Sequence, residues 1–305
     1  MTLKSDTQVY HKISAVIDRL GQNKILCEPE RFVERMKALD VLELQMLEDT
    51  EQVTDGHLTE AEILRLTRRA ERLKQKWVDA DERLFTHLLR SIRSNDLSVV
   101  RRCYKEAEQQ ISKKADADNL GYDEIDMLTS GLLEVGSVPA EPEERDGDMI
   151  YYQPTPTRII LKLIAELHLT LNDTFYDLGS GLGHVPLLIN LLTGSKTRGI
   201  EIERSYFQYS IQRLKKLRLS NVEFLNADAR NADYDDGTIF YLYTPFQGEI
   251  LRQVLGKLEA QSERRDIRIC TYGPCTLQVE KQSWLQPIYR TGKLEGSLAI
   301  FSRRC

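Results

Sequence analysis

The sequence predicts an α/β fold in which a helical N-terminal region precedes a parallel, doubly wound sheet. Three observations support this prediction. The first part of the 305-residue chain holds few glycines and repeats its apolar residues with the period of a helix. After about residue 149, short β-rich runs alternate with amphipathic helical patterns, as in a parallel sheet covered on both faces. A glycine-rich turn separates the first β-rich run from an apolar helix.

The apolar residues of the N-terminal region recur with the period of a helix, which predicts a helical bundle. Thr59 and Glu62 form a capping box at the start of a long helix, and further helices are expected over about 30–48, 97–114 and 122–133. The small number of heptads favours a bundle within one chain. The alternative is a coiled-coil homodimer through the N-terminal helices. The long helix has one apolar face, formed by Ile63, Leu66, Ala70, Leu73, Trp77, Ala80 and Leu84.

A change of composition marks the boundary between two domains. Residues 137–148, "SVPAEPEERDGD", are rich in Pro, Gly and acidic side chains, which is typical of a surface linker. We therefore expect a helical N-terminal domain over 1–136, a linker over 137–148 and a catalytic domain over 149–305.

The second domain predicts a Rossmann-like, doubly wound seven-stranded sheet with a C-terminal antiparallel hairpin. Helices are expected over 183–193, 204–218 and 247–259, and the hairpin over about 286–291 and 294–303, joined by "TGKLEG". The five strands before the hairpin are the runs "TFYDLG", "TRGIEI", "VEFLNAD", "TIFYLYT" and "IRICTYG".

Composition and charge restrict the class of protein. The formal net charge is −5, with 31 acidic against 22 basic side chains in residues 1–150 and 16 against 20 in residues 151–305. Residues 151–305 are only weakly basic, and they contain no run of basic residues interleaved with aromatic ones. Both observations disfavour a nucleic-acid substrate. Five scattered cysteines without C-x-x-C spacing indicate reduced thiols and no zinc site. The absence of a secretory or membrane-spanning segment predicts a cytoplasmic protein with no membrane partner.

Glycines at every second position follow the first strand in "DLGSGLGH", namely Gly179, Gly181 and Gly183. Glycines at this turn let the backbone approach a ligand closely. A dinucleotide site spaces its glycines as G-x-G-x-x-G to hold a pyrophosphate, and His184 stands where its last glycine belongs. The spacing therefore favours a ligand without phosphates, such as S-adenosyl-L-methionine, over NAD. His184 itself has no evident partner and is interpreted as the first residue of the helix.

The turn "DLGSGLGH" resembles the first motif of the class I, seven-β-strand methyltransferases. The resemblance implies S-adenosyl-L-methionine as cofactor. Asp177 would face its ammonium group or order water beside it. Glu201 at the end of "RGIEIE" would accept from both ribose hydroxyls, and Asp228 in "LNADAR" would accept from the adenine amino group. The candidate cofactor site is completed by Gly179, Ser180, Gly181, Gly183 and Ala229.

The fourth strand of such enzymes delivers the residues nearest the methyl group, and here it ends in "YLYTPF". Tyr243, Thr244, Pro245 and Phe246 are therefore the candidate catalytic residues. Amide-type N-methyltransferases often carry D/N-P-P-Y/F/W at this place, whereas this chain has Thr244 and a single proline. Pro245 and Phe246 would still build an aromatic wall, and core packing is the alternative for Tyr243 and Phe246.

Among class I families, "FYDLGSGLGHVPLLI" followed by "RGIEIE" most resembles the disruptor-of-telomeric-silencing type of histone lysine methyltransferase. This similarity implies a lysine amine as methyl acceptor and a segment that closes over the cofactor. Tyr151 or Tyr152 are further candidate walls of the acceptor channel. The alternatives are a small-molecule or nucleic-acid methyltransferase, or a non-catalytic protein that binds the cofactor.

The segment "DMIYYQPTPTRII" precedes the first strand of the sheet. By the same resemblance, Tyr152, Gln153 and Thr155 would fold over the methionine end of the cofactor. The pair Thr155 and Pro156 predicts an N-cap followed by proline at the first helical position.

Overall fold

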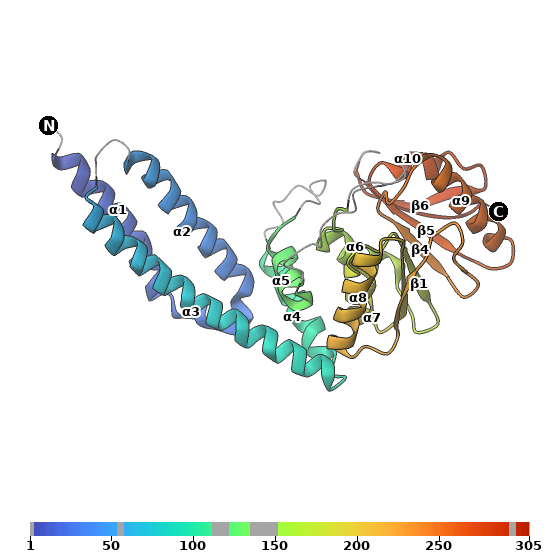
Figure 1. Ribbon diagram of the computed structural model, residues 1–305, viewed down its shortest axis with the longest axis horizontal. Coiled ribbons are helices and arrows are strands. Elements are labelled where there is room, and N and C mark those ends of the chain that lie inside the picture. Colours follow the sequence, from blue (N-terminus) through green and yellow to red (C-terminus); the bar gives the residue numbers. More distant parts are fainter. Residues whose placement is uncertain (1–2, 54–57, 112–121, 135–151, 293–296, 305) are drawn as a thin grey trace. The chain divides into compact units, whose positions relative to one another are not determined.

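The computed structural model describes residues 3–53, 58–111, 122–134, 152–292 and 297–304 (Figure 1). The chain forms two compact units. The first comprises Met1–Arg90 and Arg102–Ile111, and the second comprises Ser91–Arg101 and Ser112–Cys305.

A three-helix core holds the first unit together. Its helices are α1 (Leu3–Gln22), α2 (Phe32–Val53) and α3 (Glu60–Arg93), with 3-10 turns at Lys24–Cys27 and Pro29–Arg31, and α4 (Ser98–Gln110) follows. The capping box is confirmed, because Thr59 N donates to Glu62 Oε2 over 3.0 Å and Glu62 N donates back to Thr59 Oγ1 over 3.3 Å. The bundle is confirmed as well, since α1 and α2 cover the predicted apolar face of α3 with Ile13, Ile17, Ala38 and Leu42.

A buried arginine joins the helices at one end of this core. Arg35 is fully buried, and its guanidinium donates to Asp81 Oδ1 over 2.8 and 2.6 Å and to the carbonyls of Leu26 and Pro29. Removing one partner of such a buried pair typically costs about 3–5 kcal/mol. This contact is long-range, so helical periodicity gave no sign of it.

The second unit contains the predicted sheet of seven strands, in the order β3-β2-β1-β4-β5-β7-β6. The first five strands run parallel, and β7 pairs antiparallel with β5 and β6, which confirms the C-terminal hairpin. The strands are β1 (Thr174–Leu178), β2 (Lys196–Glu201), β3 (Val222–Asn226), β4 (Ile239–Leu242), β5 (Arg268–Tyr272), β6 (Leu285–Arg290) and β7 (Leu298–Arg303).

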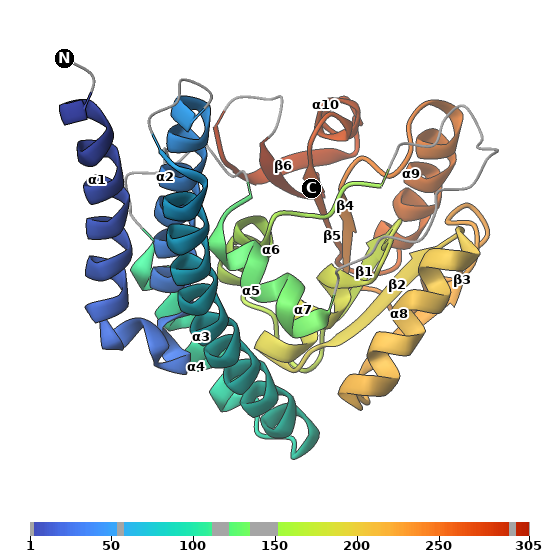
Figure 2. The same ribbon diagram turned by 60° about the vertical axis from the view of Figure 1, so that its left-hand side comes forward.

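Helices cover both faces of this sheet, with α6, α7 and α8 on one face and α9 on the other (Figure 2). The core under α9 packs Val254 and Leu258 against Phe240 and Leu242 of β4. The predicted helices after β1, β2 and β4 are confirmed, whereas the short helix α10 was not expected. The helices of this unit are α5 (Glu124–Leu133), α6 (Thr157–Leu167), α7 (His184–Thr193), α8 (Arg204–Leu217), α9 (Gly248–Ser262) and α10 (Cys275–Glu280).

Helix α5 packs beside α6. The predicted N-cap at Thr155 is wrong, because α6 begins at Thr157 with Pro156 in the N-cap position and no side-chain cap. Instead, Asp126 of α5 accepts from Thr157 N over 2.6 Å. The predicted domain boundaries stay a prediction, because residues 135–151 lie outside the described residues.

None of the described helices is long and apolar enough to cross a membrane. Four cysteines, Cys27, Cys103, Cys270 and Cys275, are free thiols. Within the ranges given above, no group of His, Cys, Asp and Glu side chains is arranged to hold a metal ion.

Candidate functional site

The order of the strands places a ligand-binding edge at the carboxyl end of β1. The strand order switches direction there, because β2 and β3 lie on one side of β1 whereas β4 and β5 lie on the other. Ligands of doubly wound sheets bind at such a point. Asp177 of β1 lies opposite Gly199 of β2 and Tyr241 of β4, one residue before the end of its strand.

All three glycines of the turn after β1 adopt the left-handed backbone conformation, with φ of 85° at Gly179, 52° at Gly181 and 84° at Gly183. L-residues rarely adopt this conformation. A Cβ at Gly179 would lie 2.3 Å from Pro245 Cβ, and a Cβ at Gly181 would lie 2.2 Å from the Tyr152 ring. The turn therefore requires glycine for its backbone conformation and for the close approach of neighbouring residues.

Backbone hydrogen bonds hold the turn against β2. The N–H groups of Gly179 and Ser180 both donate to Ile200 O over 2.9 Å. Glu201 Oε2 accepts from Gly181 N over 2.7 Å, and its Oε1 accepts from Glu203 N over 2.7 Å. Burial raises the pKa of Glu201, and these backbone donors oppose the rise. In this structure Glu201 thus fixes the shape of the glycine turn.

Asp177 is a buried acid at the centre of the site. Its side chain is only 4% exposed, and no hydrogen bond to its carboxylate is found among the described residues. Burial raises its pKa well above the ordinary value, and the negative charge of Glu201 adds to the rise. A buried carboxylate without a partner is costly, so the site favours a ligand that brings a positive charge to Asp177.

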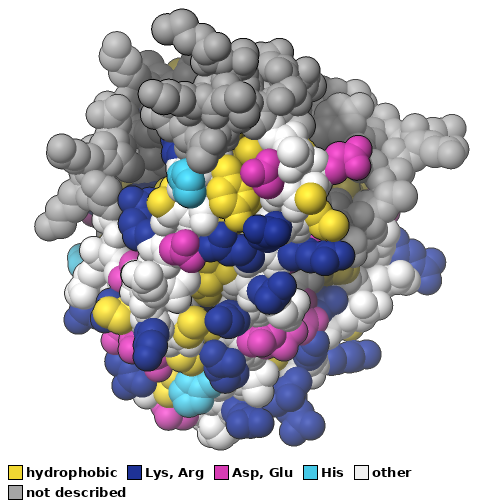
Figure 3. All heavy atoms as spheres, turned by 90° about the vertical axis from the view of Figure 1, so that its left-hand side faces the viewer, with side chains coloured by type: hydrophobic (Ala, Val, Ile, Leu, Met, Phe, Trp, Pro, Cys, Tyr) yellow, Lys and Arg dark blue, Asp and Glu magenta, His cyan; other side chains and the backbone are white. Residues whose placement is uncertain are grey.

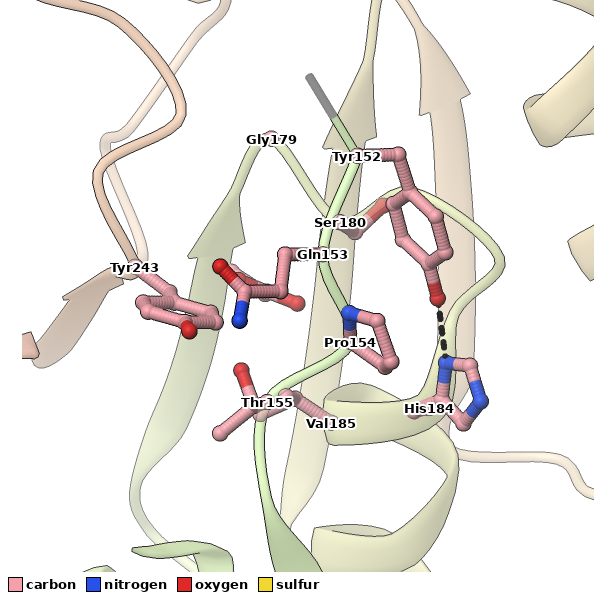
Figure 4. Close-up of a pocket in the computed structure, with 10 residues that line it drawn as sticks. Tyr152, Gln153, Pro154, Thr155, Gly179, Ser180, His184, Val185 and Tyr243 are labelled. Carbon is pink, nitrogen blue, oxygen red and sulfur yellow. Dashed lines mark hydrogen bonds between the residues drawn. The ribbon is translucent and has the colours of Figure 1, made fainter. Parts of the chain in front are cut away.

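A small cavity opens beside Asp177, and an extended segment, residues 152–155, runs along it (Figure 4). The structure brings together here many of the residues that the sequence predicts for the cofactor site or its surroundings. They are Tyr152, Gln153, Thr155, Asp177, Gly179, Ser180, His184 and Tyr243, joined by Pro154 and Val185.

Tyr152 and His184 fasten this segment to the start of α7. Tyr152 Oη lies 2.9 Å from His184 Nδ1, and the two rings are stacked (Figure 4). Burial lowers the pKa of His184 to about 4, so the imidazole is neutral at pH 7. His184 is the first residue of the helix, as predicted, but the expectation that it lacks a partner is wrong. Tyr151 lies outside the described residues.

The acid at the end of β3 lies apart from this cavity. Asp228 binds Arg230, whose Nη2 donates to Oδ2 over 2.6 Å and whose Nε donates over 3.0 Å. The hydrogen bond from Arg230 lowers the pKa of Asp228. Ala229 is buried in the core beneath it. The roles of both in holding adenine stay predictions.

The four residues after β4 point in different directions. Tyr243 lines the cavity, whereas Pro245 packs behind Gly179 and Phe246 is buried in the core under α9. Thr244 has a φ of 40°, which is a strained conformation for a β-branched residue. Its hydroxyl donates to Tyr272 O and accepts from Cys275 N, both over 3.2 Å, and so ties β4 to β5.

Two further tyrosines lie near Tyr243. Tyr272 of β5 packs on Tyr243 with ring centroids 4.8 Å apart. Tyr122, before α5, donates to Pro154 O over 2.5 Å and interacts with Gln153 and Tyr243. Tyr272 stands at the end of the predicted run "IRICTYG", where the fifth strand meets the edge that carries the site. Sequence reasoning missed Tyr122, because nothing in a single sequence places this distant residue beside the site.

The residues around the cavity fit S-adenosylmethionine, the cofactor that the sequence predicts. Its amino-acid end carries an ammonium group, which matches the unpaired carboxylate of Asp177. Ser180 Oγ is buried without a hydrogen-bond partner in the described part of the chain. Both groups are therefore available to a polar, cationic ligand.

Comparisons with known proteins agree with this site. Residues 147–237 match the family model described as Histone methylation protein DOT1. The matched region contains the glycine turn, Glu201 and Asp228. A search among curated proteins gave no significant match.

Solved structures of methyltransferases are similar to about half of the chain. An RNA methyltransferase from Salinibacter ruber in complex with S-adenosyl-L-homocysteine is 19% identical at a TM-score of 0.42, over 50% of this chain and 94% of that one. A putative methyltransferase from Escherichia coli is 18% identical at 0.42, over 50% and 87%. A methyltransferase dependent on S-adenosylmethionine from Aquifex aeolicus is 18% identical at 0.38, over 48% and 92%.

Proposed function

We propose that this protein, which is an S-adenosylmethionine-dependent methyltransferase with a seven-stranded sheet, transfers methyl groups to lysine side chains of a protein. Two observations support a lysine acceptor. The matching family model is described by histone methylation. Beside Asp177, the cavity is bordered by Tyr243, which packs on Tyr272 and interacts with Tyr122.

In the proposed arrangement, three acids hold the cofactor at the carboxyl ends of three strands. Asp177 would bind the ammonium group, Glu201 the ribose hydroxyls and Asp228 the adenine amino group. Glu201 would exchange its bond to Gly181 N for the ribose, or share it, because a carboxylate has up to four acceptor positions. Residues 152–155 would cover the methionine end, with Tyr152 held by His184.

The tyrosines suit an amine acceptor because they stay neutral and exclude water. Burial raises the pKa of Tyr243 and of Tyr272, so both hydroxyls keep their protons at neutral pH. A lysine amine has an ordinary pKa near 10.4, and aromatic walls lower it by disfavouring the charged form. Tyr243 is therefore the residue that we expect to face the acceptor, whereas Phe246 supports the strand from the core.

When bound, S-adenosylmethionine supplies an electrophilic methyl group on a positively charged sulfur. The chain's residues hold the unprotonated amine nitrogen in line with that methyl group and exclude water from it. In the transfer, the amine nitrogen would take the methyl group, and the sulfur would keep the bonding electron pair and leave as a neutral thioether. The lysine ammonium group would lose its proton to solvent before it enters the channel, so no residue of the site is required as a general base.

Labelled methyl groups test this proposal. Purified protein is incubated with methyl-labelled S-adenosylmethionine and, separately, with core histones, an unrelated lysine-rich protein, RNA and a small-metabolite extract. We expect label on a lysine ε-amine of a protein, as identified by mass spectrometry. Label confined to RNA or to small molecules would contradict the lysine assignment while leaving the methyltransferase assignment intact.

Replacing Tyr243 by alanine should impair turnover of the methyl acceptor without weakening binding of the cofactor. We expect kcat/KM for the protein acceptor to fall by about tenfold or more, because the lost wall admits water beside the amine. The dissociation constant for the cofactor should stay within about threefold, a change of under 1 kcal/mol. Tyr289→Ala is the matched control, since this partly exposed tyrosine of β6 packs on Lys162. An unchanged kcat/KM in Y243A would exclude Tyr243 from the acceptor site.

Two finer points belong to the proposal. We infer that the enzyme is cytoplasmic and that its N-terminal helices form a homodimer. The apolar face of α3 is already covered by α1 and α2 of the same chain, so such a dimer would use the outer surfaces of these helices.

A further inference from the structure

The outer surface of α3 carries a row of basic side chains, which we call the basic stripe. It consists of Arg65, Arg68, Arg72 and Lys76, and all four are exposed. Their spacing of three, four and four residues places them along one side of the helix. At 1.5 Å per residue the stripe is about 17 Å long. Figure 3 shows a face of the molecule on which Lys and Arg side chains are numerous, with Asp and Glu side chains between them.

Two other basic residues of α3, Arg69 and Lys74, differ from the stripe in having ion-pair partners. Arg69 Nη2 lies 2.6 Å from Asp18 of α1, and Lys74 Nζ lies 2.6 Å from Glu43 of α2. Within the described residues, Arg68, Arg72 and Lys76 form no ion pair. Arg69 and Lys74 thus hold the bundle together, whereas Arg68, Arg72 and Lys76 are available to bind an external anion.

The chemistry of the stripe points to a chain of phosphates. Successive cations are separated by about 4.5–6 Å of helix rise, so they can meet a row of evenly spaced anions. Three of the four are arginines, whose fork of donors matches phosphate oxygens. The four side chains include no aromatic ring that could stack on a base, which favours contact with the outside of a duplex over single strands.

We propose that the basic stripe binds the phosphate backbone of duplex nucleic acid without reading its sequence. The proposal concerns docking and does not make nucleic acid the methyl acceptor, so it is independent of the lysine assignment. The sequence lacks basic residues interleaved with aromatic ones, which disfavours nucleic acid as the methylated substrate. This observation does not concern docking of a duplex on α3. The remainder of the chain has a net negative charge, since the whole carries −5 with the four cations included. That charge would restrict a polyanion to this surface.

Fluorescence anisotropy with a labelled duplex DNA of about 20 base pairs tests the proposal, since at 3.4 Å per pair the duplex exceeds the stripe. The full-length protein is titrated at several salt concentrations between about 50 and 200 mM. We expect binding in the micromolar range at low salt and a slope of log K against log[salt] of about −3 to −4, because each neutralised phosphate contributes about −0.9. Absence of binding at low salt would overturn the proposal.

A charge-reversal variant, Arg68→Glu with Arg72→Glu and Lys76→Glu, should lower the affinity at least about tenfold and reduce the slope by about 3. The control variant, Lys215→Glu with Arg264→Glu and Lys281→Glu, makes the same change of net charge at exposed residues of the second unit. The control should retain the wild-type slope, and equal losses in both variants would overturn the assignment to α3.

Two further measurements keep the result interpretable. The glutamine variant, R68Q with R72Q and K76Q, should reproduce the loss of slope without introducing like charges, and circular dichroism should show unchanged helix content. Polyglutamate is the competitor. If it displaces the duplex as well as unlabelled DNA does at equal charge, the surface is a site for acidic polypeptides and the nucleic-acid proposal fails.

Discussion

Replacing Asp177 by asparagine is expected to weaken binding of S-adenosylmethionine about 100-fold or more while raising the melting temperature of the ligand-free protein. The loss follows because the variant removes the charge that faces the cofactor's ammonium group, and truncating a buried charged pair costs about 2–5 kcal/mol. The gain follows because Asp177 is buried without a hydrogen-bond partner among the described residues. Relief of about 1–2 kcal/mol raises the melting temperature by about 2–8 °C.

The same acid gives the prediction a pH dependence. Since burial and Glu201 raise the pKa of Asp177 in the folded state, its contribution to stability is fully present below the unfolded pKa near 3.9 and is lost as the pH rises through the folded pKa. The wild-type protein should therefore lose more stability than D177N between pH 4 and neutral pH. Binding of the cofactor should release protons wherever free Asp177 is partly protonated.

Asp266→Asn is the control for these measurements, because Asp266 is an exposed acid of the same unit. It should change neither cofactor affinity nor melting temperature. Calorimetry gives the affinity, and thermal unfolding across the pH range gives the stability. Unchanged affinity in D177N would remove Asp177 from the cofactor site, and a lowered melting temperature would contradict the unpaired state of its carboxylate.

Replacing Gly181 by alanine should disrupt both the glycine turn and the segment that crosses it. The new Cβ would lie 2.2 Å from the Tyr152 ring, in a residue with a φ of 52°. The left-handed conformation alone costs about 1–2 kcal/mol, and the clash displaces Tyr152 from His184. We expect a loss of cofactor affinity of about tenfold or more, measured by calorimetry, together with lower stability.

Gly194→Ala is the matched control for this variant. Gly194 also adopts a left-handed conformation, with a φ of 82°, but a Cβ there meets its nearest atoms only at 3.5 and 3.6 Å. It should therefore show the backbone cost without the clash and keep wild-type cofactor affinity. Adding Tyr152→Ala to G181A should recover part of the lost stability, as a double-mutant cycle measures. Equal losses of cofactor affinity in G181A and G194A would show that the contact with Tyr152 is unimportant.

The sequence predicts the sheet, its hairpin and the helical bundle because each depends on local periodicity. The buried face of α3 and the capping box at Thr59 follow from the spacing of residues within one helix. The left-handed glycines follow equally from the pattern of the turn. Such features need no knowledge of distant parts of the chain.

Only those parts of the site that consist of residues adjacent in sequence, or of residues at the ends of neighbouring strands, can be predicted from the sequence. Asp177, Ser180 and Tyr243 meet because parallel strands end at one edge of the sheet. The contact of Tyr122 with Pro154 joins residues from different elements and has no local signature. The partner of His184 could not be foreseen for the same reason, since Tyr152 belongs to a segment without regular structure.

Titration of the wild-type protein with S-adenosylmethionine, S-adenosylhomocysteine and NAD tests the central claim most directly. The unpaired Asp177 and the glycine turn predict micromolar binding of both adenosyl compounds and no binding of NAD. They also predict proton release that depends on pH in the range where Asp177 titrates. Failure to bind either adenosyl compound, or binding of NAD in their place, would contradict the assignment of this edge of the sheet as a methyltransferase cofactor site.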